Sequence, residues 1–332
     1  MRYRSVVAGL HESFDGRRFR RGRRTTAEQR RMSHAACLSN PMDVTCGSID
    51  ANGIEIHYLR QGSGPLVICS HGFPDHARSF LPLLAELAHA GFTAVAPYLR
   101  GYAPSGTAPA DQYHTCYMAH DLRALIDALG VEQAILVGHD WGAQASIAAA
   151  ILFPERVTKL VALGWSRPDA AQRLHYDYLK GIWHTFFFQS PSAEQVLAHD
   201  DFAFIEAWWR DASRNWDVPR DIIEAVKTTF RQPGVLDAAL AQYRCRHVAL
   251  RDPERREQQA RIAAGPVTVP TLLMHGTHDR EGRLEAFSGD GVPEYFSAAL
   301  TREIVDGAGH FLHLEKPADV NRSIIDFIVA RS

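Results

Sequence analysis

Asp140 stands where the sequence pattern places a nucleophile. It is the centre of the run Gly-His-Asp-Trp-Gly at 138–142, which follows the apolar stretch 134–137 and precedes a segment rich in small residues. The pattern predicts a buried strand, a sharp turn and a helix, with the central residue exposed at the end of the strand. Glycine is needed on both sides because a side chain there would clash. A residue that only capped the helix would need no such glycines, so the pattern favours a nucleophile.

A carboxylate at this position indicates a different reaction from that of a serine. A serine hydroxyl must lose a proton to a base before it attacks a carbonyl carbon. A carboxylate is already ionised at neutral pH and suits attack on a saturated carbon. The product of that attack is an alkyl ester of the protein. Water must then cleave this ester at the carboxyl carbon, with the help of a general base.

Three further segments follow apolar runs and complete a recognisable order. They are Ser-His-Gly-Phe-Pro-Asp at 70–75, His-Gly-Thr-His-Asp at 275–279 and Gly-Ala-Gly-His at 307–310. From about residue 50 to its end, the chain resembles the α/β-hydrolase superfamily, and within it the epoxide hydrolases and haloalkane dehalogenases. The first segment resembles the HGxP motif of epoxide hydrolases, and the other two resemble the segments that carry the catalytic acid and histidine. Nucleophile, acid and histidine follow in the order expected for this fold.

The resemblance implies a catalytic triad of Asp140, Asp279 and His310. His310 would activate water for cleavage of the ester, and Asp279 would orient the imidazole and stabilise its charged form. The backbone N–H groups of Phe73 and Trp141 would form the oxyanion hole. In the family, the peptide bond after Phe73 would be cis.

Opening of an epoxide also needs an acid for the departing oxygen, and the resemblance supplies two tyrosines from an inserted helical cap. Gln-Tyr-Arg at 242–244 resembles the segment with the second tyrosine, so that role passes to Tyr243. The first should lie in 182–189, where this chain has His184 in the place of the tyrosine of many relatives. Some members use such a histidine–tyrosine pair. Packing within the cap is the alternative role for His184, and Tyr176 and Tyr178 are alternative acids.

Several functions remain open at this point. The residues favour an epoxide hydrolase that converts an epoxide to a vicinal diol, with a small apolar epoxide and water as its partners. A haloalkane dehalogenase would use the same nucleophile, but many carry Asn where this chain has Phe73. A haloacid dehalogenase acting on fluoroacetate would carry Arg where Trp141 stands. A non-catalytic small-molecule receptor would not need a complete triad, and fold alone does not decide.

Histidine pairs raise the question of a metal. His275 with His278 and His310 with His313 are three residues apart, but they lie on loops after strands and not on one face of a helix. No cysteine ligand accompanies them. The HGxP resemblance accounts for His71, and the triad accounts for His310. We therefore expect no metal and no cofactor.

The elements that must position these residues follow from apolar periodicity. Continuous apolar runs predict strands buried on both faces, as in a parallel sheet, at 66–69, 93–96, 134–137, 160–163, 272–274 and 304–305. Asn52-Gly53 between alternating runs predicts a leading hairpin. Helical spacing over 118–129, 80–90 and 320–328 predicts helices between strands, the first ending at Gly130. The expected fold class is α/β, with a mostly parallel sheet flanked by helices.

The alternation of strands and helices breaks between 166 and 265. Helical segments follow one another there and contain a cluster of Trp and Phe residues, which would pack against the core or line an apolar pocket. We expect a core formed by 43–165 and 266–332 and a helical cap at 166–265. Residues 1–31 hold ten arginines against Glu12, Asp15 and Glu28, with few apolar residues. We therefore expect 1–42 to be a disordered extension.

Composition narrows the functional class further. The 332 residues are 46% hydrophobic and carry a net charge of −2, which does not favour nucleic acid as a partner. No apolar stretch is long enough to span a membrane. Five scattered cysteines without a CxxC pair do not predict a disulfide scaffold and suit a reducing cytoplasm. A homodimer is possible, but the sequence does not give the oligomeric state.

Overall fold

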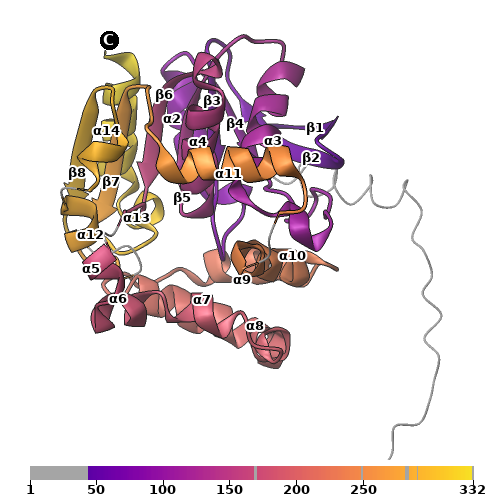
Figure 1. The fold of residues 1–332 in the computed structure, drawn as a ribbon. Helices are drawn as coiled ribbons and strands as arrows, with labels where there is room; N and C mark the ends of the chain where they lie inside the picture. Colours follow the sequence, from indigo (N-terminus) through magenta and orange to yellow (C-terminus); the bar gives the residue numbers. More distant parts are fainter. Residues whose placement is uncertain (1–43, 168–169, 248–249, 281–283, 290, 331–332) are drawn as a thin grey trace, which may run out of the picture. The chain divides into compact units, whose positions relative to one another are not determined.

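A single mixed sheet organises the part of the chain that the computed structural model describes, which is residues 44–167, 170–247, 250–280, 284–289 and 291–330. The sheet order there is β1-β2-β4-β3-β5-β6-β7-β8 (Figure 1). β2 pairs antiparallel with both β1 and β4. All the other neighbouring strands, from β4 to β8 in the sheet order, pair parallel. The strands are Thr45–Ala51, Ile54–Gln61, Leu66–Ser70, Thr93–Pro97, Ala134–His139, Val157–Leu163, Thr271–Gly276 and Leu300–Val305, numbered β1 to β8 in this order. The extension at 1–42 lies outside the described residues, so its disorder stays a prediction.

The central strands form because their residues are apolar on both faces. Every residue of β3, β4, β5 and β7 is buried, as the continuous apolar runs predict. The leading hairpin turns at Asn52 and Gly53, which both have positive φ, at 49° and 82°. Such a pair suits the two-residue turn that joins antiparallel strands. The predicted fold class is therefore confirmed, including the antiparallel start of an otherwise parallel sheet.

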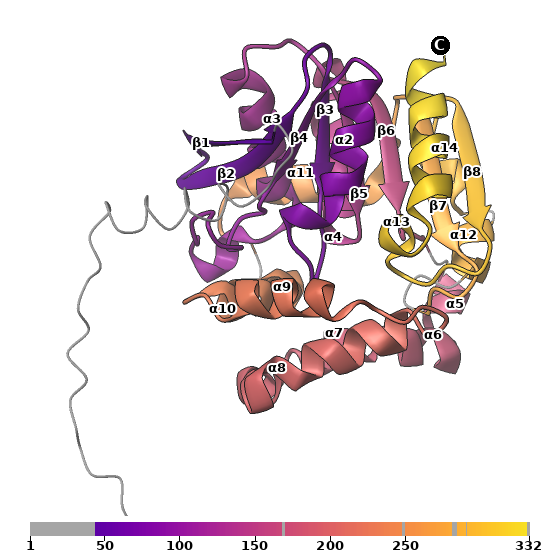
Figure 2. The ribbon, with the colours of Figure 1, turned by 180° about the vertical axis from the view of Figure 1, so that it is seen from behind.

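Helices cover both faces of the sheet. α3 (Thr115–Ala128), α4 (Trp141–Leu152) and α11 (Pro253–Ala264) lie on the face seen in Figure 1, and α2 (Leu81–His89) and α14 (Pro317–Val329) lie on the face seen in Figure 2. α3 ends before Gly130, whose φ of 73° suits the left-handed residue that follows a helix. Short helices α12 (Leu284–Ser288) and α13 (Leu312–Glu315) lie in the loops after β7 and β8. The layers that result place the carboxyl ends of the parallel strands along one edge.

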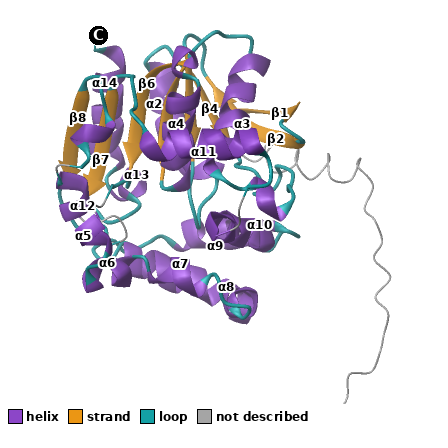
Figure 3. Cartoon of the chain, viewed as in Figure 1, coloured by secondary structure: helices purple, strands orange, loops and turns teal. Residues whose placement is uncertain are grey.

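A run of helices separates β6 from β7 and lies along that edge, below the sheet in Figure 3. Its members before α11 are α5 (Ala170–Arg173), α6 (Tyr176–Gly181), α7 (Trp183–Phe187), α8 (Ala193–Ala212), α9 (Arg220–Phe230) and α10 (Val235–Arg244). α11 follows these helices in the chain but does not lie along that edge. It packs on the core, where the Gln259 amide donates to the Thr115 hydroxyl on α3 at 3.0 Å. The predicted domain limits of 166 and 265 stay predictions.

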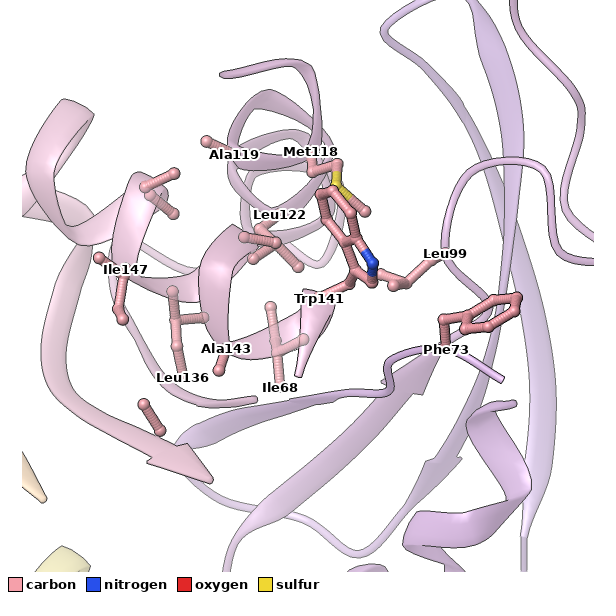
Figure 4. Packing of buried hydrophobic residues seen from close by; sticks show 14 of the residues in the cluster. Ile68, Phe73, Leu99, Met118, Ala119, Leu122, Leu136, Trp141, Ala143 and Ile147 are labelled. Atoms are coloured by element: carbon pink, nitrogen blue, oxygen red, sulfur yellow. The ribbon is translucent and has the colours of Figure 1, made fainter. Parts of the chain in front are cut away.

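Trp141 joins the nucleophile turn to the hydrophobic core. Its side chain is 1% exposed, and it lies among Met118, Leu122 and Leu99 at the start of α4 (Figure 4). Burial of so large a ring stabilises the fold by roughly 2–3 kcal/mol. The residue after the nucleophile is therefore held in place by packing, and its backbone N–H is held with it.

Two general properties follow from the described residues. None of the helices in the described ranges is both long and apolar enough to cross a membrane. Cys69, Cys116 and Cys245 are buried free thiols, whereas Cys46 is disulfide-bonded. Three of the four cysteines that the structure describes are thus free, as expected, and Cys46 departs from the expectation. The sequence could not indicate that disulfide, because scattered spacing gives no information about which cysteines lie close in space.

Candidate active site

The turn between β5 and α4 forces Asp140 into an unusual backbone conformation. Its φ is 52°, which is rare for a residue with a side chain and indicates local strain. A Cβ atom on Gly138 would lie 2.2 Å from the Gly142 carbonyl oxygen, and one on Gly142 would lie 2.0 Å from the Ser70 carbonyl oxygen. The turn is therefore as tight as the sequence predicts, and it fixes the Asp140 carboxyl at the carboxyl end of the sheet.

Two backbone N–H groups bind the Asp140 carboxylate. The Phe73 N–H donates to Oδ1 at 2.9 Å, and the Trp141 N–H is a second donor. The Asp140 side chain is 14% exposed. Burial raises the pKa of Asp140, while His310 and the two N–H donors act in the opposite direction. The structure thus brings together both residues of the predicted oxyanion hole at the carboxylate of the predicted nucleophile.

The predicted histidine and acid lie beside the other carboxylate oxygen. His310 Nδ1 is 3.1 Å from Asp279 Oδ2, a hydrogen-bond distance, and His310 Nε2 is 4.0 Å from Asp140 Oδ2. Asp279 follows β7 and His310 follows β8, so the parallel strands deliver both side chains to the same edge. His275 Nε2 also lies 3.6 Å from Asp279 Oδ2. His310 is 1% exposed, which protects the pair from bulk water.

The loop after β3 carries the first oxyanion donor and is tied to the cap helices. The Phe73–Pro74 peptide bond is cis, as the resemblance implies. The Trp209 indole N–H on α8 donates to the Pro74 carbonyl oxygen at 2.8 Å, and the Trp209 ring stacks on Phe311 with centroids 3.6 Å apart. The cap thereby contacts both the oxyanion loop and the loop that carries the predicted base.

Tyr243 and His184 lie together above this loop, on α10 and α7. The Tyr243 ring makes perpendicular contacts with Phe73 and Trp141, at centroid distances of 5.3 and 5.2 Å. The His184 ring is 5.6 Å from Tyr243 and also perpendicular to it. Both side chains are buried. Burial, aided by the charges of His310 and Arg246, lowers the pKa of His184 to about 3, so its imidazole is neutral near pH 7.

The two alternative tyrosines are placed differently. Tyr176 is 74% exposed, and Tyr178 is partly buried on the same short helix α6. Burial raises the pKa of Tyr178. Of the tyrosines weighed from the sequence, Tyr243 is the one whose ring contacts both residues of the predicted oxyanion hole.

Three residues near the site make contacts that the sequence did not indicate. His139 Nε2 lies 2.9 Å from the His310 carbonyl oxygen, Trp209 holds the oxyanion loop, and the Arg246 guanidinium lies 4.4 Å from the centre of the Trp141 ring. His139 could have been suspected from its place in the turn motif. Trp209 and Arg246 belong to the cap and carry no spacing signal that relates them to Asp140.

Comparisons with known proteins show the family of this chain. The family model described as the α/β hydrolase fold matches residues 65–317, so the chain belongs to the α/β-hydrolase fold family. It is 31% identical to Epoxide hydrolase 3 of Xenopus tropicalis, over 90% of this chain and 82% of that protein. It is 27% identical to Epoxide hydrolase A of Mycobacterium tuberculosis, over 84% of this chain and 96% of that protein.

A solved structure of an epoxide hydrolase is also similar to this chain in fold. The crystal structure of an epoxide hydrolase from Bacillus megaterium in complex with an inhibitor superposes with a TM-score of 0.74 at 25% identity, covering 86% of this chain and 100% of that one. The resemblance inferred from the motifs is therefore confirmed at the level of the family.

Substitution of Gly142 tests the tight turn. In Gly142→Ala, the new Cβ meets the Ser70 carbonyl oxygen, so we expect the free energy of unfolding to fall by about 1–3 kcal/mol. Gly106→Ala is the matched control, because its Cβ would come no closer than 3.4 Å to any atom. We expect the control to stay within about 1 kcal/mol of wild type. Denaturant unfolding measures both, and a Gly142→Ala protein as stable as wild type would contradict the turn geometry.

Proposed function

We propose that this chain is an epoxide hydrolase that opens a small apolar epoxide to a vicinal diol through a covalent ester on Asp140. The observation that carries the proposal is the unequal environment of the two Asp140 oxygens. Oδ1 accepts the Phe73 N–H, whereas Oδ2 lies on the side of His310, 4.0 Å from Nε2. That distance is too long for a hydrogen bond, so Oδ2 is the oxygen that suits attack on a substrate carbon.

The first step forms the ester. Oδ2 attacks one epoxide carbon, a new C–O bond forms, and the bond between that carbon and the ring oxygen breaks. The electron pair of the broken bond goes to the ring oxygen, which takes a proton from the Tyr243 hydroxyl. An ordinary phenol stays protonated across the working pH range, whereas an imidazole that is already neutral has no acidic proton to spare. His184 therefore orients the oxygen through one N–H and does not supply the proton.

The second step cleaves the ester and restores the carboxylate. His310 takes a proton from water, and the hydroxide formed attacks the Asp140 carboxyl carbon. The oxyanion develops on Oδ1, which already accepts the Phe73 N–H, and the Trp141 N–H is the second preorganised donor that stabilises it. The bond between the carboxyl carbon and the diol oxygen then breaks, and that oxygen takes the proton held by His310. The proton left on the new Asp140 carboxyl group passes to the Tyr243 phenolate, which restores the carboxylate and the phenol. Asp279 holds the His310 imidazole in position and stabilises its charged form during this step.

The aromatic surroundings support an apolar substrate. Phe73, Phe188, Trp208 and Tyr243 form a cluster of perpendicular and stacked rings beside the predicted nucleophile. Aromatic side chains of this kind commonly line sites for apolar ligands. The same cluster excludes water from the ester, which strengthens the interactions of the oxyanion.

Removal of His310 should separate the two steps. In His310→Ala, Asp140 still attacks the epoxide but the ester is no longer hydrolysed, because the general base is missing. After incubation with an aryl epoxide, mass spectrometry should show one substrate adduct on the peptide that contains Asp140. Asp140→Asn is the control and should carry no adduct. Full turnover by His310→Ala with unlabelled protein would contradict the proposal.

Substitutions in the cap test the source of the proton. Tyr243→Phe should slow ester formation by about 100-fold or more, the usual contribution of a general acid. His184→Phe should slow it less, because His184 only orients the oxygen, and His184→Tyr should retain epoxide opening. Single-turnover ester formation measures all three variants. If both Phe variants form ester at the wild-type rate, another residue supplies the proton or the substrate is a halide, which needs no acid.

A further inference from the structure

The loop after β8, which carries His310, is closed by the carboxylate of Glu315 at the end of α13. Oε2 of this carboxylate accepts the Gly309 N–H at 2.7 Å, and Oε1 accepts the Phe311 N–H at 3.0 Å. Glu315 therefore binds the backbone on both sides of His310. Hydrogen bonds to a charged acceptor are stronger than those to a neutral one, so these two bonds fix the course of the loop at the predicted base.

The end of α8 makes two more contacts with this part of the chain. The buried Ser213 hydroxyl donates to Glu315 Oε1 at 2.7 Å, and the His310 N–H donates to the Ala212 carbonyl oxygen at 3.1 Å. The last carbonyl groups of an α-helix have no partner within the helix, so the Ala212 carbonyl can accept from the loop. The backbone of His310 is thus held by the cap as well as by Glu315.

Gly309 allows this close packing. A Cβ atom at this position would lie 2.4 Å from the Ala212 carbonyl oxygen and 3.0 Å from Glu315 Oε1. A residue with a side chain would push away both groups that hold the loop. The second glycine of the Gly-Ala-Gly-His segment at 307–310 therefore helps to place the histidine that follows it.

The ring of His310 is oriented separately from its backbone. Its Nδ1 lies 3.1 Å from Asp279 Oδ2, which fixes the direction of the ring but not the position of the Cα atom. In the proposed reaction, water must reach the Asp140 carboxyl carbon while it hydrogen-bonds to His310 Nε2. A shift of the loop by about 1 Å would spoil that geometry even if the ring kept its bond to Asp279.

We propose that Glu315 is a positioning residue for hydrolysis of the ester, and that Ser213 links this positioning to the cap. The inference rests on the proposed function, because Glu315 acts only through His310. His310 takes no part in formation of the ester, so its displacement slows the second step and leaves the first unchanged. A general loss of packing would instead slow both steps, because both use the same Asp140 carboxylate.

Glu315→Gln tests the proposal. The amide keeps the length of the side chain but has one acceptor oxygen for the three donors, and its NH2 group would face an N–H donor. Enzyme in excess is mixed with an aryl epoxide, and mass spectrometry follows the ester on Asp140 with time. We expect ester formation within about twofold of wild type and hydrolysis slower by about 10- to 100-fold, as for a base displaced by about 1 Å.

Two further variants complete the experiment. Glu257→Gln is the matched control, because it makes the same chemical change at an exposed position of α11, and it should form and hydrolyse the ester at wild-type rates. Ser213→Ala removes only the donor from the cap and covers the case in which Glu315→Gln does not fold. It should also slow hydrolysis without slowing formation, by a smaller factor.

The outcomes separate this inference from the proposed function. A wild type that forms no ester on Asp140 overturns the proposed function, and this inference falls with it. A wild type that forms and hydrolyses the ester, with hydrolysis equally fast in folded Glu315→Gln or in Ser213→Ala, overturns this inference alone. Equal slowing of both steps in Glu315→Gln would also overturn it, because the effect would then not act through His310.

Discussion

The close approach of the backbone at Gly138 and Gly142 is the constraint on which the site depends. It leaves no room for a Cβ atom, turns the chain within a few residues and holds Asp140 at a φ of 52°. The cost of such a conformation is of order 1–3 kcal/mol, and packing around it must offset that cost. Burial of the Trp141 ring among core residues does so on the α4 side. The strained residue is the one to which the proposed reaction assigns the nucleophile.

The cap helices cover the edge of the sheet at which the predicted catalytic residues lie. Parallel strands deliver Asp140, Asp279 and His310 to one edge, but the sheet alone leaves that edge open to water. Aromatic residues of α7, α8 and α10 cover it, and the Trp209 indole bonds to the backbone of the oxyanion loop. This cover lowers the local dielectric, so the N–H donors act more strongly on a developing charge. The same burial raises the pKa of Asp140, and the donors and His310 counter that effect.

The sequence predicted the fold because the central strands are apolar on both faces and the turn motifs are local. The hairpin at Asn52-Gly53 and the tight turn at Asp140 need only a few neighbouring residues to be recognised. The contacts of His139, Trp209 and Arg246 could not be predicted, because they join segments far apart in the chain. The hydrogen bond from Ser213 to Glu315 is of the same kind. Periodicity specifies which face of an element is buried, not which distant side chain meets it.

Single turnover in water labelled with ¹⁸O tests the covalent route most directly. Enzyme in excess over an aryl epoxide completes one turnover, and mass spectrometry locates the label. The account predicts a diol that contains oxygen from Asp140 and no ¹⁸O, with one ¹⁸O atom incorporated into the Asp140 carboxyl. A diol that carries ¹⁸O in the first turnover, with an unlabelled Asp140 peptide, would show direct attack of water on the epoxide and would contradict the account.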